Sequence, residues 1–464
     1  MFDSVGSDSS ATAPMSNPTI GQRVKELLRR PDVRGMAVVI LIKVMMVVLN
    51  FTLIALAARA LDTLGFGYYS VLYSAAGLLL IVAAAGQELF VIRGWNEFFL
   101  SGDAAGLKGT FLFSFVLSAF GSLTISVVLL PVLSWSFDSQ TALAVTCFMA
   151  FAAMLQISNH LLRTSIGVAA GDGLGNLLQL SPAIAYLAWS IATQADATVS
   201  MVFVSLAIGT VLALSVHLFM MHRMVARLFP NLGNTRARVD RKAWLWRSAK
   251  LWASNCLEAT NQYVDVLIIG YLVSPTVAGA YFVTVRLANL FAAAADSINL
   301  FSTRHFPRLY FQESHDELSE FLDGLAWITV AFMATGMLGV AVGGYFVLDF
   351  INEDYATYFP ELLVLCLGTA AVGMARPCGS ILMLTGHEGR YLRIIAVSVA
   401  LRVAALLALI PSFGVMGAVC ATAASFLVAA AMMRREVKLL TALDPTIIRL
   451  IRRGSRTAYA TPIA

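Results

Sequence analysis

The chain has 464 residues, of which 59% are hydrophobic and only 13% are charged, and its mean hydropathy is +0.78. Soluble domains carry about 25% charged residues, so this composition excludes a soluble protein and indicates an integral membrane protein. The formal net charge of +5 is therefore interpreted as a signal of membrane topology and not of binding to nucleic acid.

The chain is expected to cross the membrane twelve times. A transmembrane helix needs about 20 mostly apolar residues. Such runs lie at residues 35–58, 67–92, 109–133, 141–162, 175–193, 199–221, 248–272, 277–302, 325–350, 359–384, 391–411 and 413–433. The polar residues before the first run include several arginines but no cleavable signal, so the amino terminus is expected to stay in the cytoplasm.

The loops between these runs differ strongly in charge. Counted from a cytoplasmic amino terminus, almost every loop Lys and Arg falls on the cytoplasmic side, and the external loops hold only Arg59. This asymmetry is typical of a multi-pass protein with both ends inside. The basic stretch RLIRRGSR at residues 449–456 follows the last run and is expected to contact anionic lipid head groups.

The longest polar interruption divides the runs into six and six. We therefore predict an all-α polytopic membrane protein with two six-helix lobes related by pseudo-two-fold symmetry. Its expected parts are a cytoplasmic tail (1–34), a first lobe (35–221), a basic cytoplasmic linker (222–247), a second lobe (248–433) and a basic cytoplasmic tail (434–464).

A short pattern recurs at the same point of each half. FGYYS at residues 66–70 and AGAYF at 278–282 lie 212 residues apart and place Gly67 on Gly279 and Tyr69 on Tyr281. Parallel repeats of this kind occur in transporters that bind substrate between the two halves. A glycine at the start of a span also permits close approach of two helix backbones.

Polar side chains within the runs gather in the first, second, seventh and eighth. Charged groups in a membrane are costly and should face protein or water. In the seventh run they repeat at i, i+3, i+7 and i+10, and in the eighth at i, i+3, i+10 and i+13, so each set lies along one face of a helix. The set comprises Lys43 and Asn50; Tyr69, Tyr73, Gln87 and Glu88; Asn255, Glu258, Gln262 and Asp265; and Arg286, Asn289, Asp296 and Asn299.

Two interpretations of these groups stay open. In the first, Lys43 with Glu258 and Arg286 with Asp265 are ion pairs that hold the helices together. In the second, the groups line a wet cavity in which the cations meet an anionic substrate and the carboxylates exchange Na⁺ or H⁺. For Arg402, in the eleventh run, a second cationic contact and snorkelling to the interface remain equally open.

Two stretches resemble a known family. AARALDTLGFGYYSVLYSAAGLLLIVAAAGQELFVIR and NQYVDVLIIGYLVSPTVAGAYFVTVRLANLF are similar to the polysaccharide and O-antigen (Wzx-like) flippases of the MOP superfamily. The resemblance implies that a polyprenyl-pyrophosphate-linked oligosaccharide crosses a bacterial inner membrane by alternating access. This substrate would be an O-antigen or exopolysaccharide repeat unit for the synthesis of lipopolysaccharide or another polysaccharide. Glycan polymerases or glycosyltransferases are its implied partners.

The resemblance also implies two site residues, because it makes Lys43 and Arg286 the cations expected to meet the pyrophosphate. The polar residues within the runs supply the other expected substrate contacts, which are Asn50, Tyr69, Tyr73, Asn255, Gln262 and Asn289. They also supply the candidates for ion coupling, which are Glu258, Asp265, Asp296 and Glu88. The chain departs from related lipid-linked-precursor flippases, which carry several arginines around the first two spans where this chain has one lysine.

Two alternatives belong to other functional classes. An ion-coupled multidrug or small-molecule antiporter of the same superfamily would share the lobes and would favour carboxylates in its cavity. A membrane glycan polymerase or ligase would need paired acid, base or metal-binding residues outside the membrane, and the short external loops do not supply them. We expect no enzymatic activity, no cofactor, no bound metal and no nucleic-acid partner.

Overall fold

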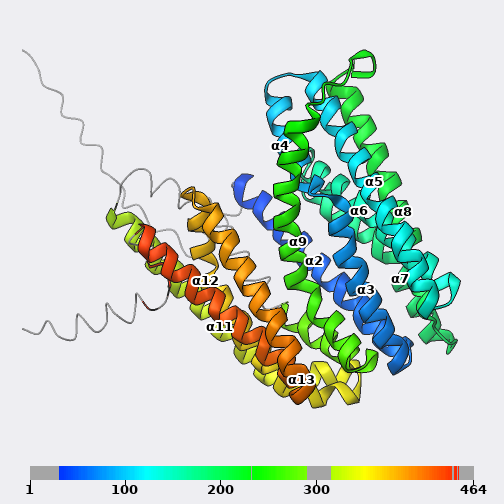
Figure 1. Ribbon diagram of the computed structural model, residues 1–464, viewed down its shortest axis with the longest axis vertical. Helices are drawn as coiled ribbons and strands as arrows, with labels where there is room; N and C mark the ends of the chain where they lie inside the picture. The colour runs from blue at the N-terminus through cyan, green and yellow to red at the C-terminus, as the bar shows by residue number, and fades with distance from the viewer. Residues whose placement is uncertain (1–30, 231, 290–314, 442–443, 447, 449–464) are drawn as a thin grey trace, which may run out of the picture.

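The computed structural model describes residues 31–230, 232–289, 315–441, 444–446 and 448 (Figure 1). Over these ranges the chain forms helices and short connections and contains no strand. The predicted all-α fold with two helical lobes is confirmed. The exact division of the sequence at residues 222–247 stays a prediction.

The amino-terminal helices form one lobe, here called the N-lobe. They are α2 (Pro31–Ala60), α3 (Thr63–Ala84), α4 (Gln87–Leu100), α5 (Ala104–Ser136), α6 (Ser139–Ser165), a π-helical turn (Ala169–Gly173), α7 (Leu174–Thr193) and α8 (Val199–Leu228). A short 3-10 turn (Leu232–Asn234) leads to the second lobe.

The remaining helices form the C-lobe. They are α9 (Arg241–Leu272), a helix over residues 275–289, α11 (His315–Ile351), a 3-10 segment (Glu353–Tyr358), α12 (Phe359–Leu384) and α13 (Glu388–Thr441). Within the described residues, eight helices are long and apolar enough to cross a membrane, judged by length and composition. Neither α7 nor α9 is among the eight; α9 carries the polar stripe of the seventh predicted span.

Several helices begin at a side-chain cap. Asp62, Asp138, Thr198 and Asp240 precede α3, α6, α8 and α9, and each accepts a hydrogen bond from a backbone N–H three residues on. Such caps satisfy an N–H that the helix itself leaves unpaired. At Asp138, hydrogen bonds from the Thr141 hydroxyl and backbone hold the pKa of the carboxyl below its usual value. The caps therefore fix where the spans start.

One predicted span is divided in the structure. The span at 67–92 is interrupted, because Ala85 (φ 53°) and Gly86 (φ 73°) are left-handed and separate α3 from α4. Hydropathy detects apolar length but not such a local backbone conformation. The runs at 391–411 and 413–433 correspond to the two helical parts of α13, which are separated by a kink at Gly414 (φ 56°, ψ −134°). The predicted span at 277–302 is described only to residue 289.

The lobes meet at one end of the molecule, here called the joined end, which holds the connections around residues 61–63, 273–275 and 352–358. Figure 1 shows the two bundles converging there and separating toward the opposite end, where residues 229–240 link them. One hydrophobic core crosses the joined end and contains Phe66 and Tyr69 from the N-lobe with Tyr281, Phe282 and Tyr355 from the C-lobe. We call the opposite end the linker end.

A contact between α2 and α11 reinforces the joined end. The Arg59 guanidinium lies 4.0 Å from the centre of the Phe350 ring, and its Nε donates a hydrogen bond of 3.1 Å to the Phe350 carbonyl. The Phe66 and Tyr355 rings, one from each lobe, are 6.0 Å apart. Aromatic and cation–π contacts of this kind each add to the stabilisation that the surrounding apolar burial provides.

Glycines line the contact between α3 and the C-lobe. A Cβ added at Gly67 would lie 2.4 Å from the Pro275 carbonyl, and one added at Gly279 would lie 3.2 Å from the Gly67 Cα. Further along α3, a Cβ at Gly77 would lie 2.7 Å from the Tyr263 ring. The two glycines of the repeated sequence pattern thus face each other across the lobes. The close approach predicted from that pattern is an approach between the halves.

Gly67→Ala is therefore expected to destabilise the protein by about 1–3 kcal/mol, because the added methyl group meets rigid backbone that cannot rotate away. The matched control is Gly343→Ala on α11, where a Cβ meets nothing within 4 Å. Thermal unfolding of both variants in the same detergent measures the difference. Equal unfolding midpoints for the two variants would contradict the close backbone contact between the lobes at Gly67.

Candidate functional site

The described residues of the site predicted from the sequence lie on α2, α3, α4, α9 and the helix over 275–289. In the structure these helices are the ones that bring the lobes together, because α3 follows α9 from the joined end toward the linker end. Near the linker end, the Trp252 indole N–H donates to the Val82 carbonyl at 3.0 Å. The polar residues are therefore placed at the lobe interface and not in the interior of one lobe.

Arg286 lies among aromatic rings from both lobes. Its guanidinium is 4.9 Å from the Phe282 ring centre and 5.5 Å from that of Tyr263. The Tyr73 ring of the N-lobe is 6.1 Å from Phe282, and Arg286 interacts electrostatically with both Tyr69 and Tyr73. Arg286 is half-buried, and no carboxylate of the described residues pairs with it. Rings stabilise the cation here without neutralising it.

Tyr69 and Tyr73 pack against one another with ring centres 5.6 Å apart. Tyr69 is fully buried, and its hydroxyl has no hydrogen-bond partner within the described part of the chain. An unpaired buried hydroxyl is costly. The predicted pair of tyrosines is thus brought together with Arg286, in a group that combines one cation with phenol hydroxyls.

The α2 residues of the prediction lie further toward the linker end. Lys43 is exposed, and Asn50 is half-buried and donates to the Met46 carbonyl of its own helix at 2.9 Å. Figure 1 shows this part of α2 on the side of the N-lobe that faces the C-lobe. No ion pair joins Lys43 to an acid among the residues that the structure places.

Asp265 is the centre of a buried network within the C-lobe. Its Oδ2 lies 2.9 Å from Nη2 of Arg402, and the side chains of the two residues are only 6% and 3% exposed. The same oxygen accepts hydrogen bonds from the Tyr281 hydroxyl at 3.0 Å and from the Thr422 hydroxyl at 2.9 Å. Arg402 also donates to the Asn261 amide oxygen at 2.6 Å. The carboxylate is thus paired with a cation and hydrogen-bonded through Oδ2, while Oδ1 is buried without a hydrogen-bond partner among the described residues.

This network corrects the expected ion pairs. Arg402, and not Arg286, is the partner of Asp265, and Glu258 is exposed without an ion pair to Lys43 in the described residues. The rise of a helix gives the depth of each residue in the membrane, but it does not tell which helices pack side by side. Arg402 reaches Asp265 because α13 packs beside α9, and a carboxylate inside protein is strongly stabilised by such a partner. Snorkelling is excluded for Arg402 by its burial.

The other predicted residues are distributed unevenly. Asn255 donates to Oε1 of Glu88 at 2.5 Å, which joins α9 to α4. Gln262 is exposed, and Asn289 is half-buried at the last described position of its helix. Asp296 and Asn299 lie outside the described residues. No group of three or more His, Cys, Asp or Glu with metal-binding proximity occurs among the residues searched.

Sequence reasoning did not assign Asn261, Tyr281 and Thr422 to the network around Asp265. Tyr281 stood in the repeated pattern, so the sequence carried a signal for it. Thr422 lies in an apolar run where a hydroxyl is ordinary, and Asn261 lies one residue away from the predicted stripe. Only the packing of α13 against α9 reveals their role.

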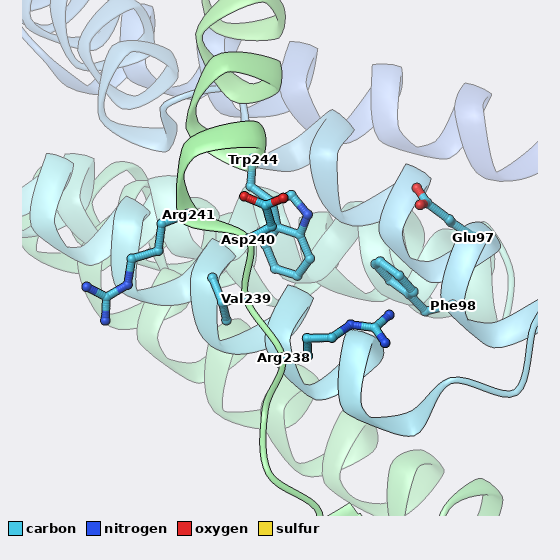
Figure 2. Close-up of a pocket in the computed structure, with 7 residues that line it drawn as sticks. All are labelled: Glu97, Phe98, Arg238, Val239, Asp240, Arg241 and Trp244. Atoms are coloured by element: carbon cyan, nitrogen blue, oxygen red, sulfur yellow. The ribbon is translucent and has the colours of Figure 1, made fainter.

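A surface groove of about 750 Å³ lies at the linker end (Figure 2). Its lining residues are Glu97, Phe98, Arg238, Val239, Asp240, Arg241 and Trp244. Most of the charges are already engaged: Arg247 pairs with Glu97 at 3.0 Å, Arg238 pairs with Asp103, and Asp240 caps α9. The Arg238 backbone N–H also donates to the Ala105 carbonyl at 3.0 Å. The groove marks where the linker is fastened to the N-lobe.

Comparison with known proteins identifies the architecture. The sequence matches no protein-family model and no curated protein. Among solved structures, the inward-facing conformation of a multidrug resistance MATE family transporter of the MOP superfamily is similar, with a TM-score of 0.66 and 14% identity over 84% of this chain and 96% of that one. This chain has the fold of the MOP-superfamily transporters.

Two further structures support the MOP fold. An outward-facing conformation of a MATE family transporter gives a TM-score of 0.56 at 14% identity, over 90% of this chain and 99% of that one. A MOP superfamily transporter from Pyrococcus furiosus gives 0.54 at 13% identity, over 87% and 93% of the two chains.

Arg402→Met is expected to lower the free energy of unfolding by about 3–5 kcal/mol, because it leaves the Asp265 carboxylate buried without its cation. The double variant Arg402→Met, Asp265→Leu is expected to recover most of this loss, since it removes both charges. Arg390→Met is a control in α13, where the ion pair with Glu436 is partly exposed, with side chains 49% and 24% exposed, and contributes about 1 kcal/mol or less. Thermal unfolding of the purified variants measures all three. Additive losses in the double variant would contradict the network.

Proposed function

We propose that this protein is an alternating-access transporter whose substrate is anionic, and that the substrate is a lipid-linked oligosaccharide. The observation that supports the proposal is that some charged groups at the lobe interface have a partner of opposite charge and others do not. Asp265 is neutralised by Arg402, whereas Arg286 lies between aromatic rings without a carboxylate partner in the described residues. A cation left unpaired at this place is available to a negatively charged ligand.

The fold supports transport by alternating access. Solved relatives of the same architecture include both inward-facing and outward-facing conformations. In the predicted topology the linker end is cytoplasmic, which makes the joined end external and this conformation inward-facing. Rocking of one lobe against the other then exposes the interface to the opposite side. The proposed location is a bacterial inner membrane with both termini in the cytoplasm.

The chemistry of Arg286 suits a phosphate group. A guanidinium presents several N–H donors in a rigid fork that matches phosphate oxygens. The hydroxyls of Tyr69, Tyr73 and Tyr263 offer further donors and acceptors. Lys43 is exposed on α2, nearer the linker end, and supplies a second positive charge on the way in. This order of cations fits an anion that enters from the linker end and is held near the joined end.

A lipid-linked oligosaccharide requires such a path. Its pyrophosphate and sugar hydroxyls cannot enter hydrocarbon without loss of hydration, which costs several kcal/mol for each unpaired group. A polar interface between the lobes replaces that hydration, while the lipid tail stays in the bilayer. The two stretches that resemble Wzx-like flippases, residues 57–93 and 261–291, include the α3–α9 contact and Arg286.

A multidrug antiporter is the second candidate, because the solved structures of similar fold are largely MATE family transporters, and two of these structures are described as those of a multidrug resistance transporter. A cationic drug would require an available carboxylate, and Glu258 is exposed on α9. The Pyrococcus furiosus relative is described as having a binding pocket of reverse polarity, which suggests a different function for it. The unpaired Arg286 likewise gives this chain a positively charged site, where a transporter of cationic drugs would be expected to have carboxylates.

Arg286→Ala is expected to abolish export and to leave the protein inserted at normal abundance, because the residue is half-buried and holds no ion pair. Arg286→Lys should retain partial activity, since the charge remains but the fork is lost. The control is Arg223→Ala, an exposed arginine over the Phe219 ring at the linker end.

The measurement is the amount of lipid-linked oligosaccharide on the cytoplasmic leaflet of a deletion strain that expresses each variant. Accumulation in the Arg286→Ala strain, and not in the Arg223→Ala strain, supports the proposal. Normal export with Arg286→Ala would remove the residue from the mechanism. Normal glycan export in the deletion strain, with raised sensitivity to cationic drugs, would favour the multidrug function.

A further inference from the structure

The first turns of α9 carry positive charges that the proposed function does not use. The segment RKAWLWRSAK, from Arg241 to Lys250, contains four cations and no acid. It lies at the linker end, where the linker passes into α9. Its two sides have different surroundings, and the difference indicates what the charges can bind.

One side of this segment packs against the N-lobe. Trp244 is only 7% exposed, and its ring centre lies 5.4 Å from that of Phe90 and 6.0 Å from that of Phe98. Arg247 pairs with Glu97 at 3.0 Å. The start of α9 is therefore held in place by the N-lobe, and its other side is turned outward.

The outward side combines cations with large apolar side chains. Trp246 is 68% exposed and Leu245 is 49% exposed. Cations and apolar groups that share one exposed helix face are typical of a helix at the membrane surface. The exposed residues of this side, which repeat at i and i+4 in two adjacent rows, are Arg241, Lys242, Leu245, Trp246, Ala249 and Lys250.

Two aromatic residues indicate where the membrane lies along this side. Tyr271, near the joined end, is 88% exposed, and about seven helical turns separate it from Trp246, so the two share one side of α9. The separation is roughly 37 Å along the helix axis, which is close to the thickness of a bilayer. Trp and Tyr gather at both interfaces of a membrane. Gln262 of the predicted site lies on the opposite side, so the side with Trp246 and Tyr271 faces lipid.

Three cations gather at the level of the lipid phosphates. Arg241 and Lys242 precede Trp246 by about 6–8 Å along the axis, on the side of the linker end. Lys250 lies one turn deeper, but its Nζ is 5.3 Å from the centre of the Trp246 ring. A lysine that reaches back in this way brings its charge to the interface while its stem covers apolar surface.

These cations have no carboxylate partner among the residues that the structure places. Arg241, Lys242 and Lys250 form no ion pair there. The two acids that line the neighbouring groove are engaged, because Asp240 caps α9 and Glu97 has an arginine partner. Figure 2 shows the Arg241 guanidinium directed away from Glu97. A surplus of positive charge is left at this surface.

We propose that the outward side of α9 between Arg241 and Lys250 binds the phosphate groups of anionic phospholipids in the cytoplasmic leaflet. The Arg241 guanidinium donates to phosphate oxygens, Lys242 and Lys250 add positive charge, and Trp246 packs against the glycerol and upper acyl chain. The exposed apolar side chains favour a lipid over a free anion, which would leave them in water. The site is separate from the basic stretch at the carboxy terminus, and the inference does not depend on the transported substrate.

Trp246 is a direct probe of the bound lipid. The experiment records tryptophan fluorescence of the purified full-length protein in phosphatidylcholine nanodiscs that contain brominated phosphatidylglycerol, which quenches indole on contact. A parallel sample contains the same mole fraction of brominated phosphatidylcholine. The Trp246→Phe protein is measured in both and subtracted. We expect stronger quenching of Trp246 by phosphatidylglycerol, and we expect the preference to weaken at high salt.

Charge-removing variants test the cations. Arg241→Gln and Lys242→Gln are each expected to lower the relative affinity for phosphatidylglycerol about fivefold, and the double variant more. Arg241→Lys should retain most of the preference, because it keeps the charge. Arg390→Gln, at the start of α13, removes the same charge from the C-lobe and should leave Trp246 quenching unchanged. The α9 side chains are exposed and hold no ion pair, so these variants should fold normally.

Three results would overturn the inference. Equal quenching of Trp246 by the two brominated lipids would mean that the surface does not select an anionic head group. A preference that persists in the double variant would place the selection elsewhere, for example at the basic carboxy-terminal stretch. Displacement of the brominated lipid by inorganic phosphate would indicate a site for a free anion. None of these results depends on glycan export, so the proposed function is tested separately through Arg286→Ala.

Discussion

Backbone contact between Gly67 and Pro275 joins the two lobes, and the positions of the interface side chains follow from it. The repeated pattern sets Gly67 and Gly279 against each other, so each half supplies a small residue at the same place. Close approach of helices without side chains between them strengthens packing in a membrane, where no hydrophobic force drives helices together. It also leaves little freedom for one lobe to slide along the other at the joined end.

The charges at the interface divide according to what surrounds them. Asp265 is enclosed with Arg402, Tyr281 and Thr422 inside the C-lobe, and this group serves to fix α13 against α9. Arg286 and Lys43 hold no such partner in the part of the chain that the structure describes. A charge that has an opposite charge beside it contributes to stability, whereas a cation without a carboxylate partner is free to bind a ligand. The proposed anionic substrate follows from that division.

The break between α3 and α4 gives the same interface a second role. A continuous helix would carry Glu88 past α9, but Ala85 and Gly86 turn the chain so that Gln87 and Glu88 meet Ser248 and Asn255. The N-lobe therefore touches α9 at the linker end through polar groups and at the joined end through glycines and rings. Polar contacts can be exchanged for water at modest cost, while the apolar contact at the joined end resists opening.

Composition and periodicity were sufficient to predict the all-α fold, the two lobes and the four helices that carry the polar groups, because apolar length and helical spacing are local properties of the chain. The partner of Asp265 could not be predicted in this way. Equal depth pointed to Arg286, and only the packing of α13 beside α9 shows that Arg402 is the partner. The break at Ala85 and Gly86 was likewise missed, since hydropathy does not record backbone dihedral angles. Which charges are paired and which stay available is set by contacts between distant segments, and those contacts exist only in the folded molecule.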